Sequence, residues 1–225
     1  MAVRGLSCAK VRTFLPLVAL SCAVVLVGCS AGRTAAPDPP AAGPPAAGQP
    51  GQLPSDNSAA PVPGPGTCKL GNRDGQPLPD QKCTPGAINP SVTQANINDT
   101  ICKSGWTKTV RPPTSVTNKI KQEIDQAYGM PTNTEGELDH DVSLELGGGP
   151  DDPRNLWVEP GKIPNPKDAV ENKLHAAVCS GLVPLASAQE AIAKNWVTAF
   201  DDVGLRVAGG KVCLRADPTR CVTGR

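Results

Sequence analysis

Histidine is scarce in this sequence, which contains only His140 and His175 among its 225 residues. Chemistry that needs an imidazole group therefore has two candidate positions. The sequence also lacks a Cys-x-x-Cys pair, which argues against a structural zinc site, and it contains no internal repeat.

A strongly basic charge is missing as well. The chain has 22 basic and 21 acidic residues, and its first 28 residues carry three of the basic ones and none of the acidic ones. The remainder therefore has 19 basic and 21 acidic residues, a net charge of −2. This balance argues against a basic surface that binds nucleic acid tightly and without specificity. It still allows an enzyme that makes only transient phosphate contacts and holds a metal cation.

No apolar run near the N-terminus is long enough to cross a bilayer. Residues 14–27 form a short apolar stretch that follows three basic residues, which is typical of a secretory signal. The Leu-Val-Gly-Cys tetrad that ends at Cys29 resembles a bacterial lipobox, in which the cysteine is lipidated and becomes the first mature residue. We therefore expect a signal peptide over residues 1–28 and a lipid anchor on Cys29 that holds an exported protein at the outer face of the cell membrane. An ordinary cleaved signal, with Cys29 incidental, is the alternative.

Residues 31–66 consist mainly of Ala, Pro and Gly and show no periodic apolar pattern. Such a segment cannot bury enough apolar surface to offset the entropy of ordering. We therefore expect a disordered tether over residues 29–66. Residues 67–225 remain, which is enough for one domain with its own core.

Cysteine is abundant by contrast. Two of the nine cysteines lie in the predicted signal and Cys29 is the predicted lipidation site, so six remain. An even number in an exported domain predicts three disulfides. The sequence allows many pairings, and the one that we favour is Cys68–Cys83, Cys102–Cys179 and Cys213–Cys221.

A strand pattern lies in the middle of the domain. Apolar and polar residues alternate over residues 138–146, which predicts a strand with one buried face. A glycine turn follows over residues 147–149, and a second short strand is expected over residues 156–158. Short β-prone pieces are also expected over residues 95–111.

Helical patterns flank these strands. Apolar spacing predicts a helix over residues 116–128, capped by Ser115. Asn165 followed by proline is typical of a helix start and predicts a helix over residues 166–179. A last helix is expected over about residues 185–201. The order of strands and helices predicts an α+β fold.

Asp139 and His140 lie next to each other in the predicted strand. Strict alternation would direct the two side chains to opposite faces, so they can serve one site only at a strand end or a bulge. A core or rim histidine is the ordinary alternative for His140.

The helix predicted over residues 166–179 also carries polar side chains on one face. A helical wheel places Asp168, Glu171, Asn172 and His175 in one stripe. Glu171 and His175 are four residues apart, a spacing that allows two side chains to reach one cation. A solvated face of an amphipathic surface helix is the alternative.

The ordered set of these motifs resembles the HNH, or ββα-metal, endonuclease superfamily, and more closely a group of small secreted bacterial HNH-like proteins. The matching segments are Leu138-Asp139-His140, Leu144-Glu145-Leu146-Gly147-Gly148, Asn155-Leu156-Trp157 and Glu171-Asn172-Lys173-Leu174-His175-Ala176-Ala177-Val178-Cys179. The resemblance covers about residues 100–200. It implies a core of two strands and one helix around a metal ion, with flanking helices.

The resemblance implies a role for each hairpin residue. His140 matches the general base that takes a proton from the attacking water. Asp139 matches a ligand of one divalent cation, which stabilises charge on the phosphate. Asn155 matches the asparagine that holds the loop and orients the base.

The remaining metal ligand of the family lies on the helix. His175, which we favour, or Asn172 matches this position, with Glu171 assisting. Oxygen ligands suit Mg²⁺ or Mn²⁺, whereas a histidine ligand favours Zn²⁺, Ni²⁺ or Mn²⁺, so the metal stays open.

These expectations combine into a secreted, lipid-anchored, metal-dependent endonuclease that hydrolyses phosphodiester bonds of DNA or RNA. We expect a monomer without a small-molecule cofactor. The alternative is a catalytically inactive HNH-like scaffold that acts as a binding module of the cell envelope. The near-neutral charge and Asp141, an acidic residue beside the proposed base, favour this alternative. Ser143 is a second departure from the usual motif, which often has proline there.

Overall fold

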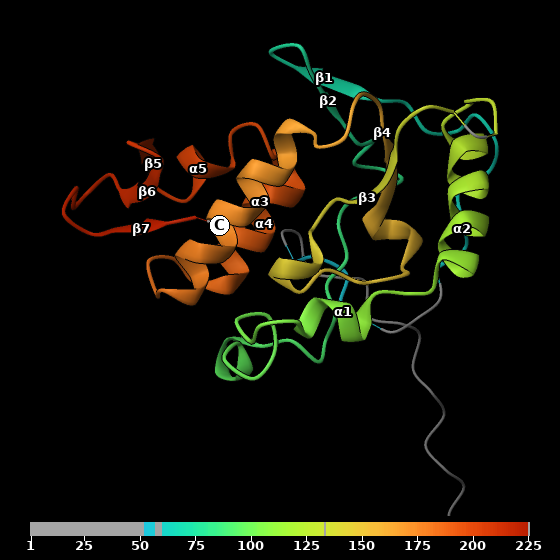
Figure 1. Ribbon diagram of the computed structural model, residues 1–225. Helices are drawn as coiled ribbons and strands as arrows, with labels where there is room; N and C mark the ends of the chain where they lie inside the picture. Colours follow the sequence, from blue (N-terminus) through green and yellow to red (C-terminus); the bar gives the residue numbers. More distant parts are fainter. Residues whose placement is uncertain (1–51, 57–59, 133, 225) are drawn as a thin grey trace, which may run out of the picture. The chain divides into compact units, whose positions relative to one another are not determined.

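Short strands and helices make up the part of the chain that the computed structural model describes, residues 52–56, 60–132 and 134–224 (Figure 1). The predicted signal peptide and Cys29 lie outside these residues. The strands are β1 (Gly71–Arg73), β2 (Gln76–Leu78), β3 (Glu137–His140), β4 (Leu156–Glu159), β5 (Leu205–Ala208), β6 (Lys211–Leu214) and β7 (Cys221–Thr223). The α-helices are α1 (Trp106–Val110), α2 (Thr114–Ala127), α3 (Pro166–Cys179), α4 (Leu185–Asn195) and α5 (Ala199–Asp202), and the 3-10 helices are η1 (Gln94–Asn96), η2 (Leu144–Leu146) and η3 (Pro153–Asn155). In this part of the chain the strands form the antiparallel sheets β1–β2, β3–β4 and β5–β6–β7, so the predicted α+β class is confirmed.

The hairpin β3–β4 and the helix α3 follow one another in the chain, as the sequence predicts. β3 pairs with β4 so that His140 lies opposite Leu156. α3 begins after Asn165, whose side chain accepts a hydrogen bond from the backbone N–H of Asp168 (3.2 Å). The Asp168 carboxylate in turn accepts one from the backbone N–H of Asn165 (3.1 Å). This reciprocal cap explains why α3 starts where the sequence predicts.

β3 ends at His140, whereas the alternating pattern predicts a strand as far as residue 146, so that part of the prediction is wrong. Pairing continues for one more residue, because the backbone N–H of Asp141 donates to the carbonyl of Asn155 (2.8 Å). The Asn155 side chain then binds both backbone groups of Val142, which occupies the groups that a longer ladder would need. The leucines that follow are buried in η2 instead.

Two predicted helices differ in their bounds. α2 begins at Thr114 and its N-cap residue is Pro113, so Ser115 is not the cap. The last predicted helix is broken into α4 and α5. The side chain of Asn195, the last residue of α4, accepts a hydrogen bond from the backbone N–H of Val197 (3.0 Å), and such a local bond competes with helix continuation.

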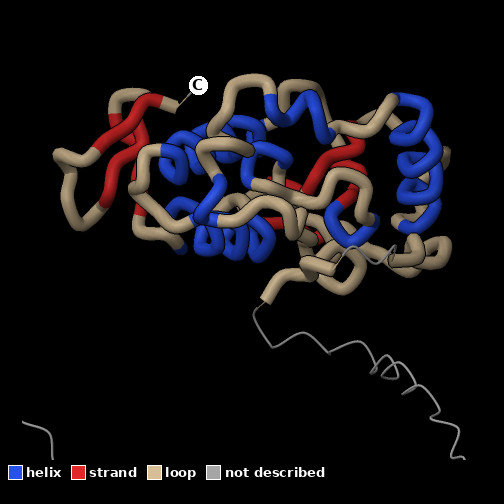
Figure 2. The backbone as a smooth tube through the Cα atoms, turned by 90° about the horizontal axis from the view of Figure 1, so that it is seen from below, coloured by secondary structure: helices blue, strands red, loops and turns tan. Residues whose placement is uncertain are grey.

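Two regions contain elements that the sequence pattern does not predict. η1 and α1 occur where short strand pieces are expected. β5, β6 and β7 form a small sheet after α5, visible in red near the C-terminus in Figure 2. Each of these strands has only three or four residues, too few for a period of two to be recognised.

Two clusters of buried apolar side chains hold the elements together. The larger cluster includes Leu174 and Val178 from α3 and Ile192 from α4. The smaller cluster includes Ile124 from α2 and Trp157 from β4. Burial of one large apolar side chain contributes about 1.5–3 kcal/mol, so this packing is the main force that positions β4 and α3.

Three disulfides are present in the described residues: Cys68–Cys83, Cys102–Cys179 and Cys213–Cys221. This is the pairing that we favour from the sequence. Three disulfides are typical of an oxidising, extracellular environment. None of the helices described here has the length and hydropathy of a membrane span.

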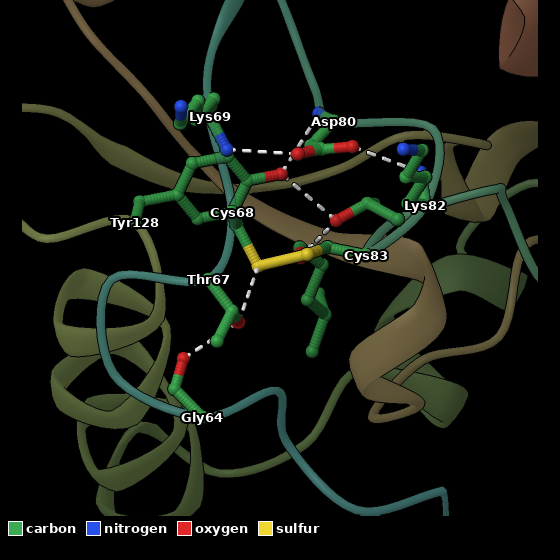
Figure 3. The surroundings of a disulfide bond; sticks show 10 residues. Gly64, Thr67, Cys68, Lys69, Asp80, Lys82, Cys83 and Tyr128 are labelled. Carbon is green, nitrogen blue, oxygen red and sulfur yellow. Dashed lines mark hydrogen bonds between the residues drawn. A yellow bond between two sulfur atoms is a disulfide. The ribbon is translucent and has the colours of Figure 1, made fainter.

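The disulfide Cys68–Cys83 lies in a hydrogen-bond network that joins distant parts of the chain (Figure 3). The hydroxyl of Thr84 donates to the carbonyl of Leu156 in β4 (3.2 Å), so it accepts from the hydroxyl of Tyr128, next to α2 (3.0 Å). The Tyr128 oxygen accepts from the backbone N–H of Asp80 (3.0 Å). The network therefore attaches the disulfide loop to both α2 and the hairpin.

Several described residues near the end of the predicted tether, residues 29–66, contact the domain. Leu53 packs against the larger apolar cluster, and the carbonyl of Pro54 accepts a hydrogen bond from the N–H of Ile88 (2.8 Å). The N–H of Gly66 donates to the carbonyl of Gln126 in α2 (2.8 Å). These contacts begin before residue 67, where the sequence pattern places the start of the domain.

Candidate functional site

A pocket of about 370 Å³ lies beside β3 and the first half of α3. It brings together Asp139 and His140 from β3 with Glu171 and Asn172 from α3. The other charged residues in its lining are Arg111, Glu137, Glu145 and Asp168. Its volume is typical of ligand sites, and it contains four of the predicted catalytic and metal-ligand residues.

A larger pocket of about 490 Å³ lies along residues 149–153. Two carboxylates in its lining, Asp56 and Asp152, are ion-paired with Arg154 at 2.7 and 2.6 Å. Its lining contains no histidine, so we assign the chemistry to the pocket that contains both Asp139 and His140.

The carboxylates of Asp139 and Glu171 converge on the ammonium group of Lys167. Its Nζ donates to Asp139 Oδ2 (2.8 Å), to the backbone carbonyl of His140 (2.6 Å) and to Glu171 Oε1. The lysine side chain is completely buried. The sequence pattern does not identify this lysine as a site residue, because a lysine four residues before a glutamate is also a common surface pair on helices.

The pair Lys167–Asp139 is charged at neutral pH. Burial alone would raise the pKa of Asp139, but the ammonium of Lys167 outweighs burial and lowers this pKa. Burial also opposes the charge of Lys167, yet Asp139 and Glu171 together raise its pKa. The two groups therefore stabilise each other in the protein interior.

Three further carboxyl groups near this pair have raised pKa values. Burial raises the pKa of Glu159 to about 9, and the negative charge of Asp139 adds to the rise. Burial raises the pKa of Glu171 to about 8, although Lys167 opposes the rise. Burial also raises the pKa of Asp141, whose two carboxyl oxygens have no hydrogen-bond partner among the described residues. One ammonium group among four carboxyl groups cannot keep all of them ionised.

The ring of His140 is held by a hydrogen bond between its Nε2 and the carbonyl oxygen of Pro150 (3.0 Å). A carbonyl oxygen only accepts, so Nε2 carries the proton and Nδ1 of the neutral ring keeps its lone pair. Burial lowers the pKa of His140, and this effect exceeds the opposite effect of Asp139. The ring is therefore neutral at neutral pH and can accept a proton at Nδ1.

Asn155 is completely buried and ties the loop after β3 to the start of β4. Its Oδ1 accepts from the backbone N–H of Val142 (2.8 Å), and its Nδ2 donates to the carbonyls of Val142 and Gly149 (both 2.9 Å). Gly149 precedes Pro150, whose carbonyl holds the ring of His140. Asn155 thus has the geometry that the loop-holding role requires.

His175 makes its contacts away from Asp139. Its Nε2 is hydrogen-bonded to the carbonyl of Ile101 (2.9 Å), and its Nδ1 lies 3.9 Å from Glu145 Oε2. The sulfur atoms of Cys102 and Cys179 and a nitrogen of this ring lie within 4.8 Å of one another, an arrangement that resembles a metal site. The two sulfurs are joined in a disulfide, however, so neither is available as a thiolate ligand.

The expected metal ligands are therefore not gathered around one point. Asp139 and Glu171 face the ammonium group of Lys167, whereas His175 is held elsewhere. The side-chain amide of Asn172 donates to a backbone carbonyl of its own helix (2.7 Å). An ammonium group already occupies the point where the two carboxylates meet. This donor set does not fit the expected divalent cation, and we derive no step through one.

Arg111 is a second pocket residue that no sequence motif identifies. It is exposed, lies between α1 and α2, and lines the same pocket as His140. It also lines another pocket of about 290 Å³ along α2, which shares Leu138 and His140 with the first. A single arginine in a loop carries no sequence signal, so only the tertiary structure reveals that it lies near His140.

Comparison with known proteins shows no relative of this chain: no family model, no curated protein and no solved structure matches it. The functional assignment therefore depends on the arrangement of Asp139, His140, Asn155 and Lys167.

Proposed function

We propose that this protein is an exported, lipid-anchored endonuclease whose domain hydrolyses phosphodiester bonds of DNA or RNA, with His140 as the general base. The hydrogen bond between His140 Nε2 and the carbonyl of Pro150 carries this proposal. It leaves Nδ1 as the basic nitrogen, and the lowered pKa of the ring keeps it neutral. The three disulfides agree with export.

Arg111 provides positive charge near the base. A guanidinium group binds phosphate through paired hydrogen bonds and keeps its charge at any working pH. Its position where two pockets share His140 suits a phosphodiester whose chain continues on both sides. In this proposal Arg111 stabilises the charge that develops on the phosphate while His140 takes a proton from the attacking water.

The acidic residues near the pocket would repel a phosphate if all were ionised. Burial raises the pKa of Glu159 to about 9, so this carboxyl group is protonated at neutral pH. Asp139 remains charged, but its charge is balanced by Lys167. Protonation and ion pairing together reduce the negative charge that the substrate meets.

The test is cleavage of plasmid DNA and of single-stranded RNA by the full chain and by His140→Gln. Loss of the general base is expected to slow cleavage by about 100-fold or more. Melting curves followed by circular dichroism show whether the variant is folded. Equal cleavage by the two folded proteins would remove His140 from the role of base.

His175→Gln is the second informative variant. If His175 were a metal ligand, as the family resemblance implies, its loss would slow cleavage as strongly as loss of His140. Its hydrogen bond to Ile101 instead predicts a lower melting temperature with cleavage retained.

A non-enzymatic binding module of the cell envelope is the second candidate. The closed ion pair between Lys167 and Asp139 favours it, because this pair completes the buried cluster without a catalytic cation. Failure of the folded wild-type protein to cleave DNA or RNA, with or without Mn²⁺, would support this candidate.

A further inference from the structure

We propose that the ammonium group of Lys167 is the resident cation of this site and that it excludes a divalent metal ion from the point between Asp139 and Glu171. This inference rests on the proposed function for the location of the site. It goes beyond that function because it states which cation holds the strand and the helix together.

The three hydrogen bonds of Lys167 use all of its donors. An ammonium group has three N–H bonds, and Nζ has three oxygen acceptors: Asp139 Oδ2, Glu171 Oε1 and the carbonyl of His140. The side chain is also fully buried. Lys167 therefore has no donor left for a phosphate and is not a substrate-binding lysine. Its function is to join β3, which carries the proposed base, to α3.

A divalent ion and the ammonium group would compete for the same oxygens. Such an ion would lie about 2.0–2.6 Å from its carboxylate ligands, within the space that Nζ now occupies. Displacing Lys167 would also leave its charge without acceptors in the protein interior, which is strongly unfavourable. The lysine is therefore expected to keep divalent ions out of this position.

Removal of the ammonium group should turn the position into a metal site. In Lys167→Ala the carboxylates of Asp139 and Glu171 and the carbonyl of His140 would remain around an empty space, and oxygen donors of this kind suit Mn²⁺. We expect Lys167→Ala to bind one Mn²⁺ about tenfold more tightly than the wild-type protein, or better, in calorimetric titration. The double variant Lys167→Ala/Glu171→Gln is expected to lose this gain. A folded Lys167→Ala that binds Mn²⁺ no better than wild type would overturn the inference.

The wild-type protein provides a test that does not depend on the folding of that variant. We expect that the wild-type protein does not bind Mn²⁺ stoichiometrically through Asp139. The absence of such binding supports the inference. If wild type binds one Mn²⁺, and Asp139→Asn removes the binding while the matched variant Glu137→Gln keeps it, the inference is overturned.

Cleavage assays separate this inference from the proposed function. Cleavage that persists in EDTA supports both. Cleavage that requires Mn²⁺ and stops in EDTA overturns the inference but leaves the nuclease function. An inactive wild-type protein whose Lys167→Ala variant gains the Mn²⁺ site removes the nuclease function and supports the inference.

Discussion

The side-chain amide of Asn155 holds the backbone of the loop between β3 and β4 through hydrogen bonds. Its amide binds the N–H and carbonyl of Val142 and the carbonyl of Gly149, and so closes the loop between the two strands. Gly148 makes this closure possible, because a Cβ atom there would lie 1.8 Å from the carbonyl oxygen of Val142. Asn155 and the glycine run are thus parts of one loop, and the carbonyl of Pro150 in that loop holds His140.

Replacement of Asn155 tests this arrangement. Asn155→Ala removes the side-chain partner of four backbone groups, the N–H groups of Ala87 and Val142 and the carbonyls of Val142 and Gly149, and is expected to lower the free energy of unfolding by about 3 kcal/mol. Asn155→Asp keeps one acceptor but places an oxygen against two carbonyl oxygens, so we expect a loss at least as large. Urea unfolding measures both changes. A loss below about 1 kcal/mol in either variant would show that the loop is held in another way.

Glu159 predicts a dependence of stability on pH. Its pKa is about 9 in the folded protein, raised chiefly by burial, against an ordinary value of 4.5. Between these values the folded state holds a proton that the unfolded state has lost, so this group makes stability fall as pH rises. Glu159→Gln cannot ionise and is expected to lose less stability than wild type between pH 5 and pH 9 in urea unfolding. Parallel pH profiles for the two proteins would contradict the raised pKa.

At the scale of elements, the start of α3 is set by a cap that the sequence predicts, and α3 carries two residues of the site. The cap formed by Asn165 and Asp168 sets the first turn of the helix, and Lys167 lies in that turn. Lys167 and Glu171 are four residues apart, so their side chains lie on the same helix face, where Glu171 contacts Lys167 and Lys167 contacts β3. The cap therefore determines the direction of the ammonium group relative to Asp139.

Asn165→Ala tests the cap. It is expected to lower the free energy of unfolding by about 1 kcal/mol and also to slow cleavage, because Lys167 and Glu171 lose their fixed position. Ser115→Ala is the matched control: Ser115 lies near the start of α2 but is not its N-cap residue, so little change is expected. Chemical denaturation and plasmid cleavage give the two readouts. An equal loss of stability in the two variants would show that the cap has no special contribution.

At the scale of the whole molecule, disulfides join segments that the short elements cannot hold alone. Cys102–Cys179 links residues 77 positions apart and attaches the segment before α1 to the end of α3. Cys213–Cys221 links residues only 8 positions apart, within the sheet of β6 and β7. A disulfide that closes a longer loop removes more entropy from the unfolded chain. Cys102–Cys179 is therefore expected to stabilise the protein more than Cys213–Cys221.

Removal of each disulfide tests this ranking. Replacement of both Cys102 and Cys179 by alanine is expected to cost about 2 kcal/mol more stability than the same replacement of Cys213 and Cys221. Urea unfolding of the two double variants gives the difference. If removal of the short-range disulfide proves equally costly, chain entropy is not the main contribution of these bonds.

Local chemistry alone determined part of this protein. The Asn165–Pro166 start identifies α3, and the even number of cysteines in the domain predicts three disulfides, because caps and cysteine number act through the residues themselves. The strand alternation was less informative. It marks β3 correctly but continues past His140, where a side chain from a different segment, Asn155, ends the ladder.

Only the tertiary structure decided which polar residues meet. The helical period shows that Asp168, Glu171, Asn172 and His175 share a stripe, but not which neighbour that stripe faces. Packing of α3 places Lys167 between Asp139 and Glu171 and leaves His175 beside the carbonyl of Ile101. The physical reason is that periodicity specifies angles around one helix axis. The partner of each side chain depends on how that helix packs against strands and loops elsewhere in the chain.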